Sequence, residues 1–282
     1  MDKKEMASLV NEVINGYKTS PVDLLSINDA EGELLYLQSL KYTYTRTISD
    51  ILNHSRLSQK VKVLEIGTFL GLVSICLSKL GYDVYATDIP EFISNKNLQM
   101  KFHTFNVRFS ASNLNSYSLP YADEMFDIIV MCEVLEHLNF NPLPVIKEIN
   151  RVSKSGCLLY LSLPNIASWG NRIRLLKGKS IHDPIEYYFK QLDPNDNMIV
   201  GLHWREYTIG EVKQMLEPLG FAVSKQYYFS IIDLSSILRP RNLLKKLVFG
   251  LLPSLKEFQI TFAVKIKNCD REFFFTDATT PR

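Results

Sequence analysis

The chain has 282 residues, of which 46% are hydrophobic and 22% charged, and its formal net charge is +2. This composition is typical of a globular protein that buries one large core, or a core with a lid, and it excludes a disordered chain. A net charge this small argues against a nucleic-acid surface, which needs clustered Lys and Arg.

Localisation and redox state follow from what the sequence lacks. The four cysteines form no CxxC pair, so we interpret them as reduced residues. The amino end has no apolar signal-peptide core, and no run of about eighteen uncharged apolar residues follows. We therefore expect a cytoplasmic protein.

Apolar runs of strand length alternate with helical patterns along residues 61–163, which is typical of a parallel sheet with helices on both faces. The expected strands are Lys62–Ile66, Asp83–Thr87, His103–Phe109, Phe126–Met131 and Cys157–Leu163. The expected helices are Leu70–Leu80, Glu91–Met100 and Leu143–Ser153. Residues 1–60 are expected to form a helical segment in front of this core.

The alternation stops after Leu163, so residues 164–207 are predicted to be an insertion that acts as a lid. Residues 208–268 restore the pattern, with Thr208 as a helix N-cap, Gly220 at the helix end and a last strand at 258–267. A second insertion, 231–256, has Arg and Lys at helical spacing among apolar residues. A tail at 269–282 completes the chain.

The stretch "VLEIGTFLG" predicts a strand followed by a ligand-binding turn. A dinucleotide site would need a glycine where Phe69 stands, because that glycine lets the backbone approach a pyrophosphate. A carboxylate at Glu65 would repel a pyrophosphate, but it suits a ligand that carries an amino group and a sulfonium. Asp88, at the end of the next strand, can accept hydrogen bonds from ribose hydroxyls. Together these features describe S-adenosylmethionine (SAM).

Four ordered motifs carry a family resemblance: "VLEIGTFLG", "VYATDI", "LPYADEMFDIIVMCEVLEHL" and "INRVSKSGCLLYLSLPN". They resemble the class I SAM-dependent methyltransferases, in the branch of ubiquinone-pathway and glycan-cluster enzymes. The resemblance implies an α/β, Rossmann-like seven-stranded sheet in the order 3-2-1-4-5-7-6 with the last strand antiparallel. SAM would lie across the carboxyl ends of the first four strands, with residues 1–60 as part of the cofactor and acceptor cover.

The resemblance also implies cofactor contacts, residue by residue. Glu65 and its glycine turn would hold the methionine end, Asp88 the ribose, and Asn113 the adenine in place of the family's usual Asp. Arg46 would face the cofactor carboxylate. The full expected set is Arg46, Glu65, Gly67, Thr68, Gly71, Asp88, Ile89, Asn113, Leu114, Cys132 and Glu133.

The segment "CEVLEH" raises the question of catalysis. If a helix begins there, Glu133, Glu136 and His137 share one face. His137 can then be a general base for a hydroxyl acceptor, or it can buttress the helix together with Glu136. The three can also bind a metal, as in methyltransferases with an ExxEH pattern and a further histidine, but Pro142 stands at that further position. We expect His137 and Glu136 to be catalytic, with no metal.

The acceptor is predicted from the two insertions. "HWREYT" and the first insertion resemble glycan-gene methyltransferases, so we expect O-methylation of a sugar or glycan-type small acceptor. The expected acceptor residues are Trp169, Arg172, His203, Trp204 and Arg205. A quinone or other lipid-like phenol is the alternative, and a cofactor-binding regulatory subunit without activity is another. Residues 238–256 suggest peripheral membrane contact or a homodimer interface.

Overall fold

A seven-stranded mixed sheet organises the chain. The structure is a computed structural model that describes residues 2–24, 30–55, 61–193, 201–231 and 247–273. The strand order β3-β2-β1-β4-β5-β7-β6 confirms the expected topology. β7 runs antiparallel to both of its neighbours, also as expected. The strands are β1 (Lys62–Ile66), β2 (Asp83–Asp88), β3 (Arg108–Ala111), β4 (Phe126–Cys132), β5 (Ser153–Pro164), β6 (Phe221–Phe229) and β7 (Phe258–Lys265).

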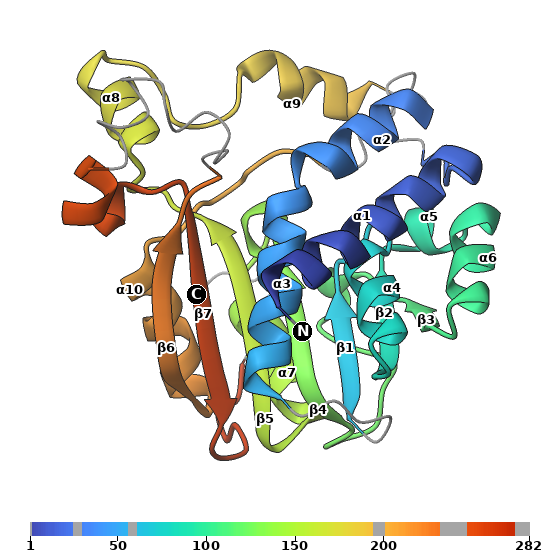
Figure 1. Ribbon diagram of the computed structural model, residues 1–282. Helices are drawn as coiled ribbons and strands as arrows, with labels where there is room; N and C mark the ends of the chain where they lie inside the picture. The colour runs from blue at the N-terminus through green and yellow to red at the C-terminus, as the bar shows by residue number, and fades with distance from the viewer. Residues whose placement is uncertain (1, 25–29, 56–60, 194–200, 232–246, 274–282) are drawn as a thin grey trace.

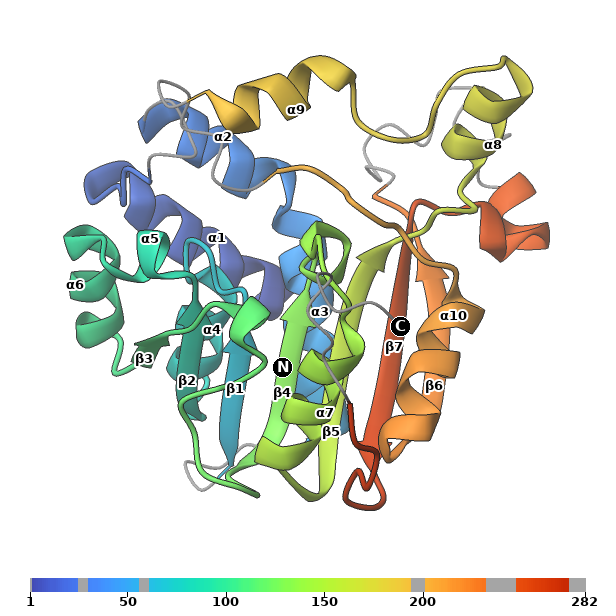
Figure 2. The same ribbon diagram turned by 180° about the vertical axis from the view of Figure 1, so that it is seen from behind.

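Helices cover both faces of the sheet, which gives three layers (Figures 1 and 2). One face carries α1 (Lys3–Thr19), α3 (Lys41–His54) and α4 (Leu72–Lys79). The other face carries α7 (Leu143–Val152) and α10 (Ile209–Leu216). α2 (Ala30–Ser39), α8 (Trp169–Leu176) and α9 (Ile185–Leu192) lie above the carboxyl edge of the parallel strands (Figure 1). The helical segment before β1 therefore reaches the edge where a ligand of this fold binds.

The two central strands are apolar on both sides because the helices bury both faces. Along β1 and β4, Val63 and Ile128 join the cluster under α1, α3 and α4, whereas Leu64 and Ile129 join the cluster under α7 and α10. All four side chains are at most 2% exposed. This burial fixes the strand register, because a shift by one residue would exchange the two faces.

Some predicted boundaries were wrong for local reasons. The expected strand His103–Phe109 begins only at Arg108, because α6 (Lys96–Thr104) continues through His103 and Asn106 turns the chain with φ 54°. The expected helix Glu91–Met100 is divided into α5 (Pro90–Ile93) and α6. Asn95 separates them, since its side chain accepts hydrogen bonds from the first backbone N–H groups of α6.

The insertion after β5 contains α8 and α9, and it leaves and rejoins the sheet at neighbouring points: Asn165 forms a parallel bridge with Tyr207. Of the second insertion, residues 232–246, which include the beginning of the expected membrane or dimer segment 238–256, lie outside the described residues, and 247–251 form a helical turn. None of the helices in the described ranges has the length and hydrophobicity that crossing a membrane requires.

Candidate active site

The turn after β1 packs tightly against the loop that follows β4 and against α6. Gly67 and Gly71 have φ angles of 75° and 79°, which favour glycine. A Cβ on Gly67 would lie 2.2 Å from Cγ2 of Val134, and one on Gly71 would lie 2.4 Å from Cε1 of Phe102. The turn is therefore packed against the loop that follows β4, which contains the candidate catalytic residues.

Glu65 holds this turn to the start of α4. Its Oε2 accepts hydrogen bonds from the Thr68 hydroxyl at 3.0 Å and from the Ser74 backbone N–H at 2.9 Å. Burial raises the pKa of Glu65 to about 7, against the opposing effect of these hydrogen bonds. The structure thus gives Glu65 the helix-anchoring role and leaves it at the carboxyl end of β1, where the methionine end of SAM is expected.

Asp88 ends β2 and faces the same turn. Its Oδ2 accepts a hydrogen bond from the backbone N–H of Phe69 at 2.7 Å, and its Oδ1 accepts one from Ile89 at 2.7 Å. Burial raises the pKa of Asp88 to about 6. Asp88 therefore connects the glycine turn to the end of β2, beside the place proposed for the ribose.

The other expected cofactor residues are more widely spread. Asn113 is exposed, and its side chain caps the 3₁₀ turn Leu114–Ser116. Cys132 lies at the end of β4 with its Sγ 4.0 Å from Oγ1 of Thr47, and burial raises its pKa well above the usual range. The Arg46 guanidinium carbon lies 5.9 Å from the ring centre of Tyr42 and 6.0 Å from that of Tyr227.

The helix on which Glu133, Glu136 and His137 would share one face does not form, and Leu135–His137 make only the 3₁₀ helix η2. Glu133 has φ 54° and its backbone N–H donates to the Ser162 carbonyl at 2.8 Å, so the chain turns toward β5. The Ser162 hydroxyl donates to Glu133 Oε1 at 2.7 Å. Glu136 is 0% exposed, and burial raises its pKa well above the usual range, with the nearby Glu133 carboxyl acting in the same direction.

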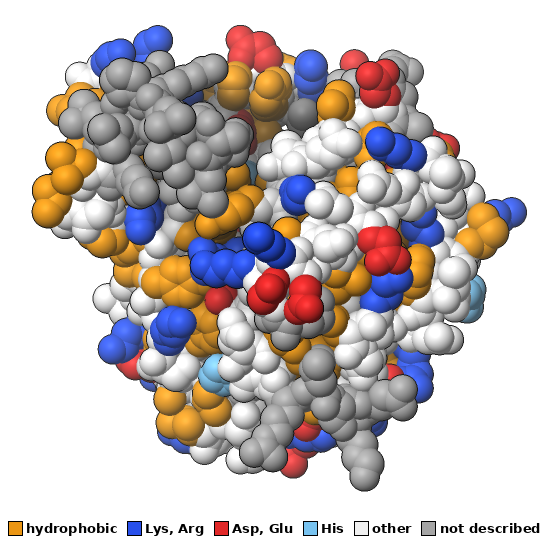
Figure 3. Space-filling model, viewed as in Figure 1, with side chains coloured by type: hydrophobic (Ala, Val, Ile, Leu, Met, Phe, Trp, Pro, Cys, Tyr) orange, Lys and Arg blue, Asp and Glu red, His pale blue; other side chains and the backbone are white. Residues whose placement is uncertain are grey.

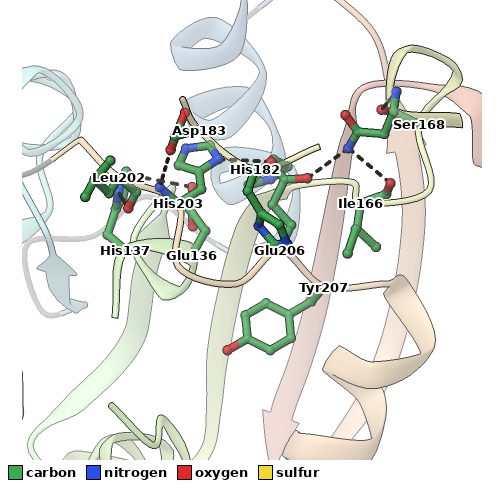
Figure 4. A network of polar contacts seen from close by, with 12 residues as sticks. Glu136, His137, Ile166, Ser168, His182, Asp183, Leu202, His203, Glu206 and Tyr207 are labelled. Carbon is green, nitrogen blue, oxygen red and sulfur yellow. Dashed lines mark hydrogen bonds and ion pairs between the residues drawn. The ribbon is translucent and has the colours of Figure 1, made fainter. Parts of the chain in front are cut away.

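Two histidines meet at η2 (Figure 4). The His137 Nδ1 is 2.9 Å from the Leu202 carbonyl oxygen, and its Nε2 lies 4.0 Å from Glu136 Oε1. The ring centre of His203 is 4.9 Å from that of His137. Burial lowers the pKa of His137, whereas a hydrogen bond with Glu206 raises the pKa of His203.

The expected acceptor residues divide into two groups. His203, Trp204 and Arg205 lie at η2, because the Glu136 carbonyl accepts hydrogen bonds from the backbone N–H groups of Trp204 at 2.8 Å and Arg205 at 3.3 Å. Trp169 and Arg172 are on α8. The Arg172 Nε donates a hydrogen bond to the Ala167 carbonyl, just before the start of this helix.

A cavity of about 680 Å³ lies next to η2 and the segment of His203. Leu138 and Trp204, which follow His137 and His203 directly, contribute to its wall. Its lining mixes apolar and polar side chains, and two of the lining residues, Arg205 and Glu211, form an ion pair of 2.9 Å. Its volume suits a small organic molecule.

Sequence reasoning missed two residues that position the histidines. The Leu202 carbonyl fixes His137, and Glu206 Oε1 lies 3.0 Å from His203 Nδ1. Asn171 donates to the other carboxyl oxygen of Glu206 at 3.1 Å. The spacing of His203 and Glu206 in "HWRE" is a usable signal for the second pair, whereas a backbone carbonyl leaves no signal in the sequence.

Comparisons with known proteins find methyltransferases. Residues 64–161 match the model of a family described as a methyltransferase domain. The ubiquinone biosynthesis O-methyltransferase of Rickettsia akari (strain Hartford) is 24% identical over 213 residues, which are 70% of this chain and 75% of that protein.

Two solved structures have a similar fold. Magnesium protoporphyrin IX methyltransferase (ChlM) of Synechocystis PCC 6803, with bound SAH, has a TM-score of 0.54 at 15% identity, over 82% of this chain and 87% of that one. A SAM-dependent methyltransferase of Methanosarcina mazei has a TM-score of 0.53 at 21% identity, over 76% and 97%.

Residues 64–161 match a methyltransferase domain, and the sheet has the fold of the SAM-dependent methyltransferases to which the chain is similar. Glu65, Asp88 and the glycine turn lie at the carboxyl edge of the sheet, which is where open α/β folds bind their ligands.

Proposed function

We propose that the protein transfers the methyl group of SAM to a hydroxyl oxygen of a small acceptor, and that Glu136 and His137 engage this hydroxyl. The observation that carries the proposal is the orientation of His137. A carbonyl oxygen only accepts hydrogen bonds, so the contact of 2.9 Å with Leu202 places the proton on Nδ1. Nε2 is then left as an acceptor for a hydroxyl proton.

Oxygen is favoured over nitrogen as the methyl acceptor for a chemical reason. A neutral hydroxyl is a poor nucleophile until a neighbouring group takes part of its proton, whereas a neutral amine needs no such help. Methyl transfer also requires the acceptor atom in line with the sulfur at about 3 Å. The contact between Gly67 and Val134 supports this placement, because it joins the proposed methionine site to the loop of Glu136 and His137.

For the acceptor itself, we propose a phenolic hydroxyl on a partly apolar molecule of the quinol type. Large apolar side chains are exposed at the carboxyl edge, over α9 and the helical turn 247–251 (Figure 3). The most exposed are Phe189 and Leu192 on α9, Leu251 in the helical turn, and Leu176 at the end of the neighbouring α8, at 72–82%. The similarity to a ubiquinone biosynthesis O-methyltransferase supports the same choice.

A sugar acceptor, which the sequence favours, is the second candidate. The Trp204 ring lies edge-to-face against Tyr188, with ring centres 5.3 Å apart, next to His203 in the chain. Trp204 is exposed and Tyr188 is half-buried, and an aromatic pair of this kind can stack on a sugar ring.

The test is a product assay with a panel of acceptors. The purified protein is incubated with SAM and with alkyl-substituted catechols, monosaccharides or primary amines, and SAH and methylated products are measured by mass spectrometry. We expect turnover with the catechols and a loss of about 10² to 10⁴ in kcat for His137→Ala. Turnover with amines alone refutes oxygen transfer. SAM binding without turnover on any acceptor favours the regulatory subunit, and turnover on sugars alone favours the second candidate.

A further inference from the structure

Three side chains from two distant segments converge at η2. Glu136, His137 and His203 each offer one ligand atom, and these atoms lie within 4.8 Å of one another. We infer that this cluster, which we call the Glu–His–His cluster, binds one divalent transition-metal ion. The sequence predicts no metal because Pro142 stands where a local histidine would be needed. His203 supplies that imidazole from the segment that follows the insertion.

Both imidazoles are already oriented as metal ligands usually are. A ligating histidine commonly donates its other ring N–H to a carbonyl or a carboxylate, which fixes the ring and its tautomer. His137 has this arrangement with the Leu202 carbonyl at 2.9 Å, and His203 has it with the Glu206 carboxylate at 3.0 Å. Each histidine therefore keeps Nε2 for a further partner.

Glu136 gives an independent reason. Its side chain is 0% exposed, and its carboxyl oxygens have no hydrogen-bond partner among the residues that the structure describes except the Glu133 carboxyl, which also raises the pKa of Glu136. A buried carboxylate that faces another carboxyl group is costly to ionise, and a bound cation is one of the few groups that removes the cost. Glu136 Oε1 lies 4.0 Å from His137 Nε2, so the carboxyl group points into the Glu–His–His cluster.

The donor set indicates which ion fits. Two imidazole nitrogens and one carboxylate suit Zn²⁺, Mn²⁺ or Co²⁺, whereas Mg²⁺ and Ca²⁺ prefer oxygen ligands alone. Bonds of about 2.1 Å place neighbouring ligand atoms about 3 to 3.5 Å apart. The cluster must therefore contract from 4.8 Å on binding, and the side chains of His137 and His203, which are 26% and 35% exposed, have room to rotate.

The role of this ion rests on the proposed function. A divalent ion at this point would act as a Lewis acid on the acceptor hydroxyl and would favour loss of its proton. His137 would then orient and hold the ion instead of acting alone as a base. Ion binding itself can be measured without an acceptor, so it does not depend on that function.

The experiment measures ion binding to protein freed of metal by a chelator and dialysis. Zn²⁺, Co²⁺, Mn²⁺ and Mg²⁺ are titrated separately by calorimetry, and the visible spectrum of bound Co²⁺ is recorded. The variants are His203→Gln and Glu136→Gln, with His103→Gln on α6 as a control that also removes one histidine. Thermal unfolding of each variant shows that it is folded.

We expect one Zn²⁺ or Co²⁺ per chain, a Co²⁺ absorption band from nitrogen ligands, and much weaker Mg²⁺ binding. Loss of a residue that only orients a metal ligand typically weakens metal binding by about 10 to 100-fold, so loss of a ligand itself should weaken Zn²⁺ binding by at least that factor. His103→Gln should bind Zn²⁺ as the wild type does. Equal Zn²⁺ affinity in His203→Gln and His103→Gln overturns the inference, and so does a preference for Mg²⁺.

Activity separates this inference from the proposed function. Full catechol methylation by chelator-treated protein overturns the catalytic role of the ion and returns His137 to the role of base. Stoichiometric Zn²⁺ binding without methylation of any hydroxyl acceptor instead leaves the ion site intact and refutes the proposed function.

Discussion

Gly67→Ala tests how closely the cofactor turn and the loop after β4 are packed. Two costs are expected. The left-handed conformation at φ 75° costs an alanine about 1–2 kcal/mol. The new Cβ would lie 2.2 Å from Val134 Cγ2, and overpacking of this kind costs about 1–3 kcal/mol. The free energy of unfolding, measured by urea denaturation, should therefore fall by about 2–5 kcal/mol.

Gly81→Ala is the matched control, because its φ is 94° and a Cβ there meets nothing within 4 Å. It should lose only about 1–2 kcal/mol and keep its affinity for SAM, whereas Gly67→Ala should lose SAM binding. Val134→Ala removes the methyl group that clashes, so the double variant should recover about 1–3 kcal/mol in a double-mutant cycle. Equal destabilisation of the two glycine variants, with no coupling to Val134, would refute this account of the turn.

Three further predictions concern ionisation and capping. Because the pKa of Asp88 is about 6 and its ionised form accepts the ribose hydrogen bonds, SAM affinity should fall about tenfold per pH unit below 6, and calorimetry should find a flatter profile in Asp88→Asn. The pKa of Glu65 is raised from 4.5 to about 7, so its stabilising protonated form is lost as the pH rises through that range. The free energy of unfolding should then decrease by up to about 3 kcal/mol from pH 4.5 to 7, and by less in Glu65→Gln. Thr208 and Glu211 form a capping box at the start of α10, so Thr208→Ala should cost about 1 kcal/mol in urea, and an unchanged midpoint would contradict the capping role.

Local patterns in the sequence predict the sheet and the residues at its carboxyl edge. Glu65 lies next to the last residue of β1 and Asp88 ends β2, as expected, because strand-length apolar runs mark both strands and their polar carboxyl ends follow from them. The start of β3 was missed because the spacing of the apolar residues Phe102, Phe105 and Val107 fits both the end of a helix and a strand. Hydrophobicity alone does not separate these cases.

The Glu–His–His cluster could not be predicted, because it depends on contacts between segments far apart in the chain. No α-helix forms at "CEVLEH", because Glu133 has a positive φ and its backbone N–H donates a hydrogen bond to the Ser162 carbonyl on β5. His203 lies beside His137 because the backbone N–H groups of Trp204 and Arg205, the two residues after His203, donate hydrogen bonds to the Glu136 carbonyl. No local pattern encodes a bond of this kind to a backbone carbonyl.

The bridge between Asn165 and Tyr207 holds the two ends of the insertion next to each other. Asn165 is fixed separately, because its side-chain amide donates to the carbonyls of Ser254 at 2.9 Å and Lys256 at 2.8 Å. Gln259 on β7 holds the other side of the bridge through the Tyr207 carbonyl at 2.6 Å. Since both anchors lie on the sheet side, α8 and α9 can be exchanged for a segment of different length without moving the strands. A chimaera made at these positions would keep Glu65, Asp88 and the glycine turn, and would replace α8 and α9 together with His203 and Glu206.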